Sequence, residues 1–311
     1  MERNTKLYAC LTKQPTHQYI IDTYGEGKVI NLHPARAAFM NGKKWPNGST
    51  IKIGFLKNKI LYNGQQVDSQ WSSHKQQFTK HIITEHIAPL VNLDFKWNVP
   101  IEEADVRISF NENMGAWCYL GTDCLHITNP KTPTLNLGWI DDNEDYDDIS
   151  YKGSGVVILH EFGHLLGMIH EHSRADAKLE WDKNKVYSTL GGPPNDWSKE
   201  DCNEQIFDQV KLSSFNGSVY DKNSVMEYYF PNDFFKNRPN LPKVNKLSRL
   251  DKIWMNKEYP GKPLPDLGQS GPEVGDDDND DDGNKSWFEK NWAMLLVICV
   301  ACILGLIFYY R

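Results

Sequence analysis

The stretch that decides the fold is residues 159–172, which read LHEFGHLLGMIHEH. His160 and His164 are four positions apart, so on a helix both imidazoles leave the same face and can bind one ion. Gly167 can adopt the left-handed backbone conformation that ends a helix. The chain can then turn so that His170 returns as a third ligand. The apolar residues between these positions are typical of a buried helix.

This pattern predicts a catalytic zinc site. Three His ligands leave the fourth position of a tetrahedral Zn²⁺ open for water, at Zn–N distances of about 2.0–2.1 Å. Zinc lowers the pKa of such a water toward about 7. Glu161 follows the first ligand, where its carboxylate can take the water's proton and pass it to a leaving amine. A structural zinc site would require a closed shell, usually with Cys, and no Cys lies in this stretch.

The composition limits the class of protein. The 311 residues include 34 Lys and Arg against 41 Asp and Glu, giving a net charge of -7, without a basic cluster. This composition argues against nucleic acid as the main partner, and we expect none. Aromatic residues at 12% and charged residues at 24% are typical of a globular chain. Six Cys are too few for a disulfide scaffold of this size.

The C-terminal end predicts a membrane anchor. Residues 292–310 are uncharged, and a helix of that length spans about 28 Å, close to the thickness of a bilayer's hydrocarbon core. Aromatic residues flank the run, with Trp292 at one end and Tyr309 and Tyr310 at the other. The first residues contain no apolar run that resembles a signal peptide. We therefore expect a single-pass, C-terminal tail anchor, in a viral or an intracellular membrane.

The remaining chain divides into three parts. Residues 261–291 form a Pro/Gly- and Asp-rich linker, in which residues 276–282 hold six Asp. Residues 43–260 are the expected catalytic domain. Residues 1–42 are an N-terminal extension, either a pro-segment or an additional edge of the domain. Alternation and helical spacing within the domain predict strands at 51–56, 93–97, 105–110 and 134–139, and a helix at 68–86.

The extended histidine motif resembles that of the metzincin zinc proteases. These proteins have a Met-containing turn downstream of the zinc helix, and Met226 lies in a similar stretch, residues 223–229. Within the clan the chain looks most like the astacin branch. Glu171 follows the third His, Arg174 matches a further position, and Trp45 resembles the start of an astacin-like domain. The resemblance covers residues 43–260.

The resemblance implies a role for each matching residue. It implies one Zn²⁺ per chain, with Glu161 as general base and acid, and the ligands would be His160, His164 and His170. Tyr228 would stabilise the oxyanion, unless it is a core tyrosine. Support of the site would come from Met226, Gly167 and Glu171. An edge strand that pairs with an extended protein or peptide substrate would contain Trp117, Cys118 and Tyr119, unless these form an ordinary strand.

The chain also departs from the astacin pattern. Ala116 stands where astacins have a Cys, so the usual disulfides are absent or rearranged. Cys118 and Cys124 either bridge a short loop or remain free thiols. Glu227 stands where astacins usually have His, which removes no ligand. We expect the fourth histidine, His172, to be a polar residue beside the ligands or on the surface.

These observations together predict an α+β, metzincin-like zincin fold. A twisted mixed sheet would lie over the zinc-binding helix, with a smaller C-terminal subdomain carrying the Met-turn. The expected function is that of a membrane-tethered zinc metalloendopeptidase. Two alternatives remain open: a catalytically inactive, membrane-anchored binding module on the same fold, and a zinc hydrolase that acts on a non-peptide amide.

Overall fold

The computed structural model describes residues 11–13, 39–40, 42–146, 154–192, 197–209, 215–216, 219–227, 229–264 and 267. The chain divides into two compact units, Met1–Leu267 and Gly268–Arg311, and all described elements belong to the first. The predicted anchor at 292–310 and the linker from residue 268 onward lie outside the described residues. Within the described part of the chain, no helix is both long and apolar enough to cross a bilayer.

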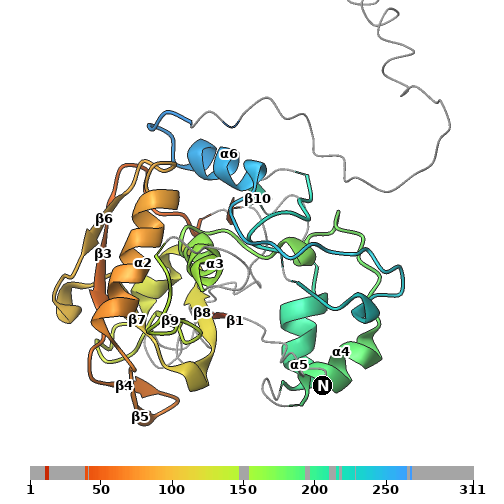
Figure 1. The fold of residues 1–311 in the computed structure, drawn as a ribbon, viewed down its shortest axis with the longest axis horizontal. Coiled ribbons are helices and arrows are strands. Elements are labelled where there is room, and N and C mark those ends of the chain that lie inside the picture. Colours follow the sequence, from red (N-terminus) through yellow and green to blue (C-terminus); the bar gives the residue numbers. More distant parts are fainter. Residues whose placement is uncertain are drawn as a thin grey trace, which may run out of the picture. The chain divides into compact units, whose positions relative to one another are not determined.

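A six-stranded sheet lies on one side of the first unit (Figure 1), with the strand order β1-β8-β9-β7-β3-β6. Four strands, β9, β7, β3 and β6, run parallel to one another. Strand β8 is antiparallel to β9, and β1 pairs with β8 in parallel. The sheet is therefore mixed, as predicted. Its strands are β1 (Leu11–Lys13), β3 (Thr50–Phe55), β6 (Asp94–Trp97), β7 (Val106–Ser109), β8 (Ala116–Tyr119) and β9 (Leu135–Leu137).

Burial alternates in β3 and β6, whereas every residue of β7 and β9 is buried. In β3, Ile51 and Ile53 are fully buried, whereas Lys52 between them is exposed. The four predicted strands correspond to β3, β6, β7 and β9, with ends that differ by at most two residues.

The structure corrects the predicted helix at 68–86. Helix α2 spans Ser73–His86 and begins after Ser72, whose hydroxyl accepts a hydrogen bond from the backbone N–H of Lys75. The preceding residues form a hairpin of β4 (Lys59–Tyr62) and β5 (Gln65–Asp68). Strand β5 is polar, so alternation does not reveal it. The turn at Asn63 and Gly64, both with positive φ, is the local signal for the hairpin.

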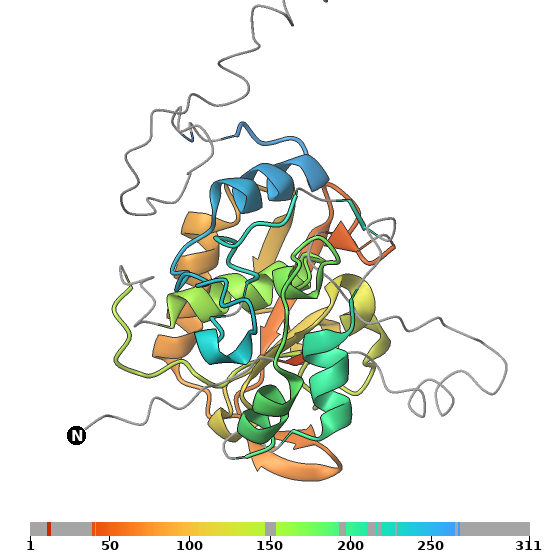
Figure 2. The ribbon, with the colours of Figure 1, turned by 90° about the vertical axis from the view of Figure 1, so that its right-hand side faces the viewer.

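Helices α2 and α3 (Gly155–Leu165) contribute to one hydrophobic core with the sheet. Phe78 and Ile82 from α2 and Phe162 from α3 are fully buried in it. Helix α6 (Arg249–Glu258) adds Met255 to the same core. Figure 2 shows α3 crossing the middle of the unit with α6 above it. The zinc-motif helix is therefore enclosed by the sheet on one side and by later elements on others.

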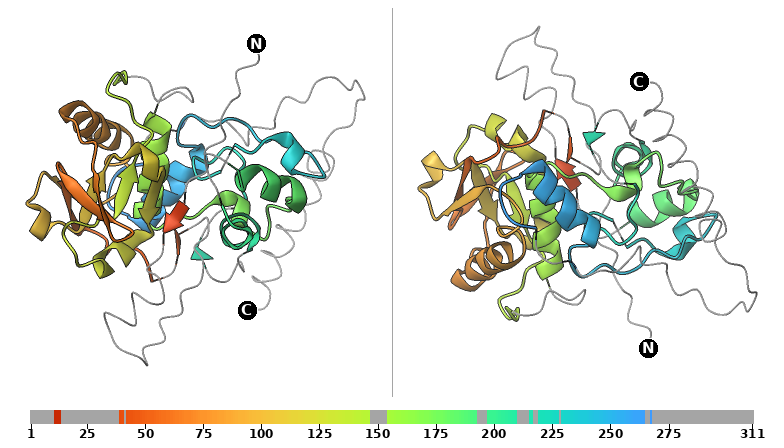
Figure 3. Two further views of the ribbon diagram at one scale, coloured as in Figure 1. Left: turned by 90° about the horizontal axis from the view of Figure 1, so that it is seen from below. Right: turned by 90° about the horizontal axis from the view of Figure 1, so that it is seen from above.

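A second, smaller hydrophobic cluster forms from residues after the histidine motif. It contains α4 (Lys183–Leu190), α5 (Lys199–Cys202), a π-helical turn (Asn203–Phe207) and a 3-10 turn (Asn232–Phe234). Helix α3 lies between the sheet and this cluster (Figure 3). This arrangement agrees with the predicted smaller C-terminal subdomain.

The remaining elements are a ladder of β2 (Phe39–Met40) with β10 (Phe215–Asn216), and 3-10 turns at Ile101–Glu103, Glu112–Met114, Gly121–His126 and Glu171–Ser173.

Candidate zinc site

Hydrogen bonds hold both ends of the zinc-motif helix α3. At its start, the Glu144 carboxylate accepts a hydrogen bond of 3.1 Å from the backbone N–H of Ser154, where a negative charge is favourable. At its end, Trp45 Nε1–H donates to the Leu165 carbonyl at 2.8 Å, and the Tyr259 hydroxyl donates to the next carbonyl at 2.6 Å. These contacts satisfy helix-terminal groups that have no partner within the helix. The position of the motif is therefore fixed by residues distant in sequence.

Gly167 ends the helix as the sequence predicts. Its φ is +95°, a conformation that other residues rarely adopt. The N–H of Gly167 donates to the carbonyl of His164 at 2.8 Å, and that of Met168 donates to Gly163 at 2.9 Å. The chain then reverses, and His170 returns to the face of α3 that carries the first two histidines.

The structure brings the three predicted ligands together. His170 Nε2 lies 3.2 Å from His160 Nε2 and 3.0 Å from His164 Nε2. Ligand atoms on a tetrahedral zinc ion are about 3.3 Å apart, given Zn–N distances of about 2.05 Å. Among the described residues, this is the group of His, Cys, Asp or Glu side chains that is arranged to hold a metal ion. The separations fit one Zn²⁺.

Two of the three imidazoles have a defined tautomer. His160 Nδ1–H donates to the Val225 carbonyl at 2.8 Å, and His164 Nδ1–H donates to the Met168 carbonyl at 2.8 Å. A carbonyl only accepts, so in each ring Nε2 keeps its lone pair for a metal. Burial lowers the pKa of His160 to about 4 and holds the pKa of His164 well below its ordinary value. The rings are therefore neutral near pH 7, as metal ligands must be.

Met226 lies in the same loop as Val225, whose carbonyl binds His160. The side chain of Met226 is fully buried, and its sulfur lies against Gly163 of α3. A β-carbon at position 163 would be 2.4 Å from that sulfur, so the contact requires glycine. We did not predict a role for Gly163, although it lies inside the motif. Gly163 and Met226 are far apart in sequence, so the motif alone does not reveal their contact.

Glu161 is fully buried on α3, next to the first histidine. Burial raises the pKa of the Cys118 thiol, and the charge of the Glu161 carboxylate raises it further. Strand β8, which carries Cys118, packs against α3, which carries Glu161. Trp117 is buried and Tyr119 half-buried in the same strand, packed against the β4–β5 hairpin. The structure thus brings the predicted substrate strand next to the histidine site.

Glu171 points away from the histidine cluster. Its carboxylate accepts a hydrogen bond from the backbone N–H of Asp221 at 3.0 Å and lies 3.5 Å from Arg174 Nε. Arg174 in turn donates two hydrogen bonds, at 2.8 and 2.9 Å, to Asp176. The backbone N–H of Glu171 donates to the Met226 carbonyl at 3.1 Å. Glu171 therefore connects the histidine segment to the loop that carries Met226.

His172 is buried, not on the surface. Its ring stacks on His170 with centroids 5.1 Å apart and packs edge-to-face against Phe230 at 5.2 Å. Its Nε2 lies 3.0 Å from the Gln205 carbonyl, and its Nδ1 lies 3.9 Å from a carboxylate oxygen of Glu227. Of the two positions expected for His172, the one beside the ligands is therefore observed.

Other predicted features have different outcomes. Tyr228 lies outside the described residues, so its predicted role stays a prediction. Cys118 and Cys124 are free and buried, so the alternative of a bridge between them is not observed.

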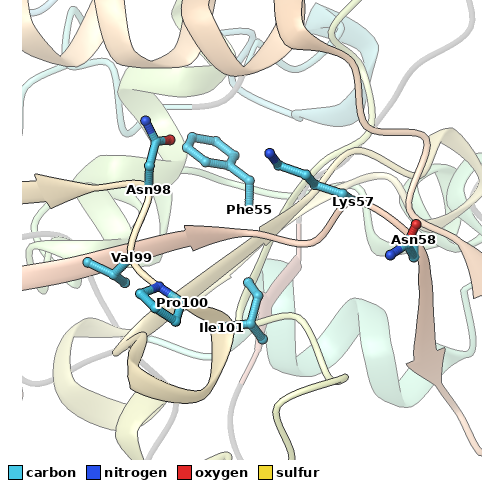
Figure 4. A pocket seen from close by; sticks show the side chains of 7 residues that line it. All are labelled: Phe55, Lys57, Asn58, Asn98, Val99, Pro100 and Ile101. Atoms are coloured by element: carbon cyan, nitrogen blue, oxygen red, sulfur yellow. The ribbon is translucent and has the colours of Figure 1, made fainter.

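A cavity of about 400 Å³ at the ends of β3 and β6 is lined by Phe55, Lys57, Asn58, Asn98, Val99, Pro100 and Ile101 (Figure 4). None of these residues belongs to the histidine site.

Comparison with solved structures shows a similarity to myroilysin. No family model and no curated protein matches the chain. The solved structure of myroilysin is 30% identical, with a TM-score of 0.61 over 73% of this chain and 100% of that chain. A crystal structure of myroilysin matches with 30% identity and a TM-score of 0.51, over 71% of this chain and 87% of that chain.

A weaker similarity is to high choriolytic enzyme 1, a hatching enzyme zinc-protease from Oryzias latipes (Medaka fish). It is 15% identical, with a TM-score of 0.44 over 72% of this chain and 98% of that chain. The myroilysin similarity covers the whole length of that protein, and here it coincides with a three-histidine group that fits Zn²⁺. The chain therefore belongs to the family of myroilysin, the astacin-like zinc metalloproteases.

Proposed function

We propose that this zinc metalloprotease is an endopeptidase that cleaves extended peptide segments, with Glu161 as its general base and acid. The observation that carries the proposal is the convergence of the Nε2 atoms of three buried imidazoles, with a buried glutamate next to the first of them in α3. A bound zinc ion would supply an activated water and polarise the carbonyl of the substrate.

Glu161 moves the proton in this proposal. Its carboxylate accepts the proton of the attacking water and then donates it to the nitrogen of the leaving amine, so that one group acts first as base and then as acid. The low-polarity surroundings strengthen the interaction between its charge and the reacting groups. Tyr228 is proposed to stabilise the developing oxyanion, as expected from its place two residues after Met226 in the sequence.

Strand β8 is proposed to hold the substrate. One side of β8 pairs with β9, and the other side pairs with the three-residue strand β1 from the N-terminal extension. An extended peptide that replaces β1 would gain the same backbone hydrogen bonds. Strand β8 packs against α3, the helix that carries Glu161. A peptide on this edge would therefore lie beside the general base.

The same pairing supports a proposal for residues 1–42. Leu11 is opposite Trp117, Thr12 is opposite Cys118, and Lys13 is opposite Tyr119. A segment on that edge and a substrate cannot both occupy it. We infer that the N-terminal extension is a pro-segment that keeps the enzyme latent by covering β8.

The membrane tether is a separate proposal and rests on the sequence. Residues 292–310 carry no charge and follow an Asp-rich run. Ile298→Arg places a charge at the centre of this segment and should release the protein from membranes into the soluble fraction, while Ile298→Leu should not. Equal membrane association of the two variants would contradict the tether.

Metal removal tests the proposed activity. The purified protein should contain one zinc ion per chain and cleave an unfolded protein substrate. Treatment with a chelator should abolish cleavage, and added Zn²⁺ should restore it. A zinc-loaded protein that cleaves neither unfolded proteins nor peptides would contradict the proposal. That result would favour the catalytically inactive binding module. If the same protein cleaved non-peptide amides, the result would favour a zinc hydrolase of that class.

A further inference from the structure

We propose that Asp251, in the first turn of α6, is a positioning residue for the zinc site, because its carboxylate fixes the loop whose carbonyl orients His160. The inference rests on the proposed function, since it concerns the metal site of the same enzyme. Asp251 lies far from the histidine motif in sequence, and no part of that motif predicts it.

The first step is the set of hydrogen bonds that Asp251 accepts. One carboxylate oxygen accepts from the Ser224 hydroxyl at 2.6 Å. The other accepts from the backbone N–H of Val225 at 2.8 Å and from that of Ser248 at 2.9 Å. Asp251 is 3% exposed, so these donors replace water around its charge. The Ser248 contact is an ordinary helix cap, but the other two donors come from the loop that contains Met226.

The second step leads from the loop to the metal ligands. The carbonyl of Val225, whose N–H binds Asp251, accepts the Nδ1–H of His160 at 2.8 Å. The Ser224 hydroxyl, which donates to Asp251, also accepts the N–H of Met226 at 3.0 Å. The two contacts hold the backbone of the loop at Val225 and Met226. The tautomer and orientation of His160 thus depend on a carbonyl that Asp251 holds in place.

A second aspartate holds the other end of the same loop. The Ser248 hydroxyl donates to Asp221 at 2.6 Å, and the backbone N–H of Asp221 donates to the Glu171 carboxylate at 3.0 Å. The first turn of α6 therefore contacts the loop at two points, through Asp251 and through Ser248. In Asp251→Asn one carboxylate oxygen becomes an NH2 donor, so either the buried Ser224 hydroxyl or the buried Val225 N–H loses its acceptor, which is unfavourable enough to shift the loop.

The chain supplies a matched control for simple helix capping. Asp201 of α5 forms the same capping box with Ser198, with the Ser198 N–H donating to its carboxylate at 2.8 Å. Unlike Asp251, Asp201 is exposed, and its side chain accepts hydrogen bonds from Ser198, the capping residue of its own helix. Asp201→Asn therefore reports the effect of weakening a capping box, without an effect on the loop.

The test compares metal binding by the full-length wild type, Asp251→Asn and Asp201→Asn. Zinc affinity is measured by competition with a chelator of known affinity, and the visible spectrum of the Co²⁺-loaded protein reports the ligand geometry. Asp251→Asn should weaken zinc binding about 10- to 100-fold and change the Co²⁺ spectrum. Asp201→Asn should leave both unchanged. Wild-type affinity and spectrum in Asp251→Asn would overturn the proposal and leave Asp251 a helix cap only.

A milder variant covers the case in which Asp251→Asn does not fold. Ser224→Ala removes one donor to Asp251 and the acceptor of the Met226 N–H. It keeps the carboxylate and its contact with Val225, whose carbonyl binds His160, so a smaller loss of zinc affinity and a smaller spectral change are expected. No change in either would also overturn the proposal. Zinc affinity and peptide cleavage are measured separately. A wild type that binds zinc but cleaves no peptide would refute the proposed activity. Only the comparison of zinc affinity among the variants can refute the role of Asp251.

Discussion

The sulfur atom of Met226 occupies the space in which any other residue at position 163 would place its β-carbon, because Gly163 and Met226 are in direct contact beneath the histidines. Gly→Ala inside a helix normally stabilises the helix by about 1 kcal/mol. Here we predict the opposite: Gly163→Ala should lower the free energy of unfolding by about 1–3 kcal/mol, because the core is overpacked.

A double-mutant cycle checks the cause of that loss. Met226→Ala removes the sulfur and leaves space for the new methyl group, so the two substitutions together should cost less than the sum of their separate effects. Urea unfolding of the four proteins measures this coupling. Additive effects would show that the cost of Gly163→Ala arises elsewhere in the helix.

Trp45 provides a prediction at the C-terminal end of α3. Trp45→Phe keeps an aromatic ring but removes the N–H that binds the Leu165 carbonyl, leaving a buried acceptor unpaired. We expect the free energy of unfolding to fall by about 1–3 kcal/mol. Trp71→Phe is the control, because its indole N–H binds the Gln76 side chain in a half-buried position. Equal losses in the two variants would argue against a special role for the cap on α3.

The ion pair between Asp176 and Arg174 should make the stability of the fold depend on pH. The hydrogen bond from Arg174 holds the pKa of Asp176 below its ordinary value. A carboxyl whose pKa is lower in the folded state stabilises the fold above its unfolded pKa of about 3.9, and this stabilisation is lost as the pH falls through the folded pKa. Asp176→Asn should therefore be less stable than wild type by about 2 kcal/mol at pH 6.

The difference in the free energy of unfolding between wild type and Asp176→Asn should become smaller as the pH falls from 6 toward 3. Urea unfolding at several pH values measures it, with Asp208→Asn as an exposed control. A difference that stays constant over this range would show that the hydrogen bond with Arg174 does not account for it.

The proposed latency gives a prediction about β1. Consecutive amides of a strand point to opposite sides, so one of the two amides at Leu11 and Thr12 faces β8. Proline removes the backbone N–H, so the double variant Leu11→Pro and Thr12→Pro removes a donor from the ladder between β1 and β8. If β1 covers the substrate strand, this variant should cleave peptides severalfold faster than wild type. The pair Leu11→Ile and Thr12→Val keeps both amides and should not. Unchanged kcat/KM in the proline variant would contradict latency through β1.

The features that the sequence predicts correctly are local. The spacing of His160 and His164 and the position of Gly167 define a helix and its end within a few residues. The alternation around Ile51 defines a strand because one face of the sheet is buried. For these features, the residues that determine the structure are neighbours in the chain.

The features that were missed depend on contacts between distant segments. The roles of Gly163 and Asp251 follow from the loop that carries Met226, which packs against both. The pairing of β1 with β8 joins residues about a hundred positions apart. The hairpin before α2 was missed for a different reason: β5 is polar, so only the turn at Asn63 and Gly64 marks it.

The central claim is that Glu161 transfers the proton in a peptide cleavage that depends on the three histidines. Its most direct test compares wild type with Glu161→Gln, which keeps the shape of the side chain but removes the base. Both proteins should bind one zinc ion per chain, and kcat/KM for an unstructured peptide should fall about 10²- to 10⁴-fold in the variant. Equal zinc content with equal cleavage would contradict the account.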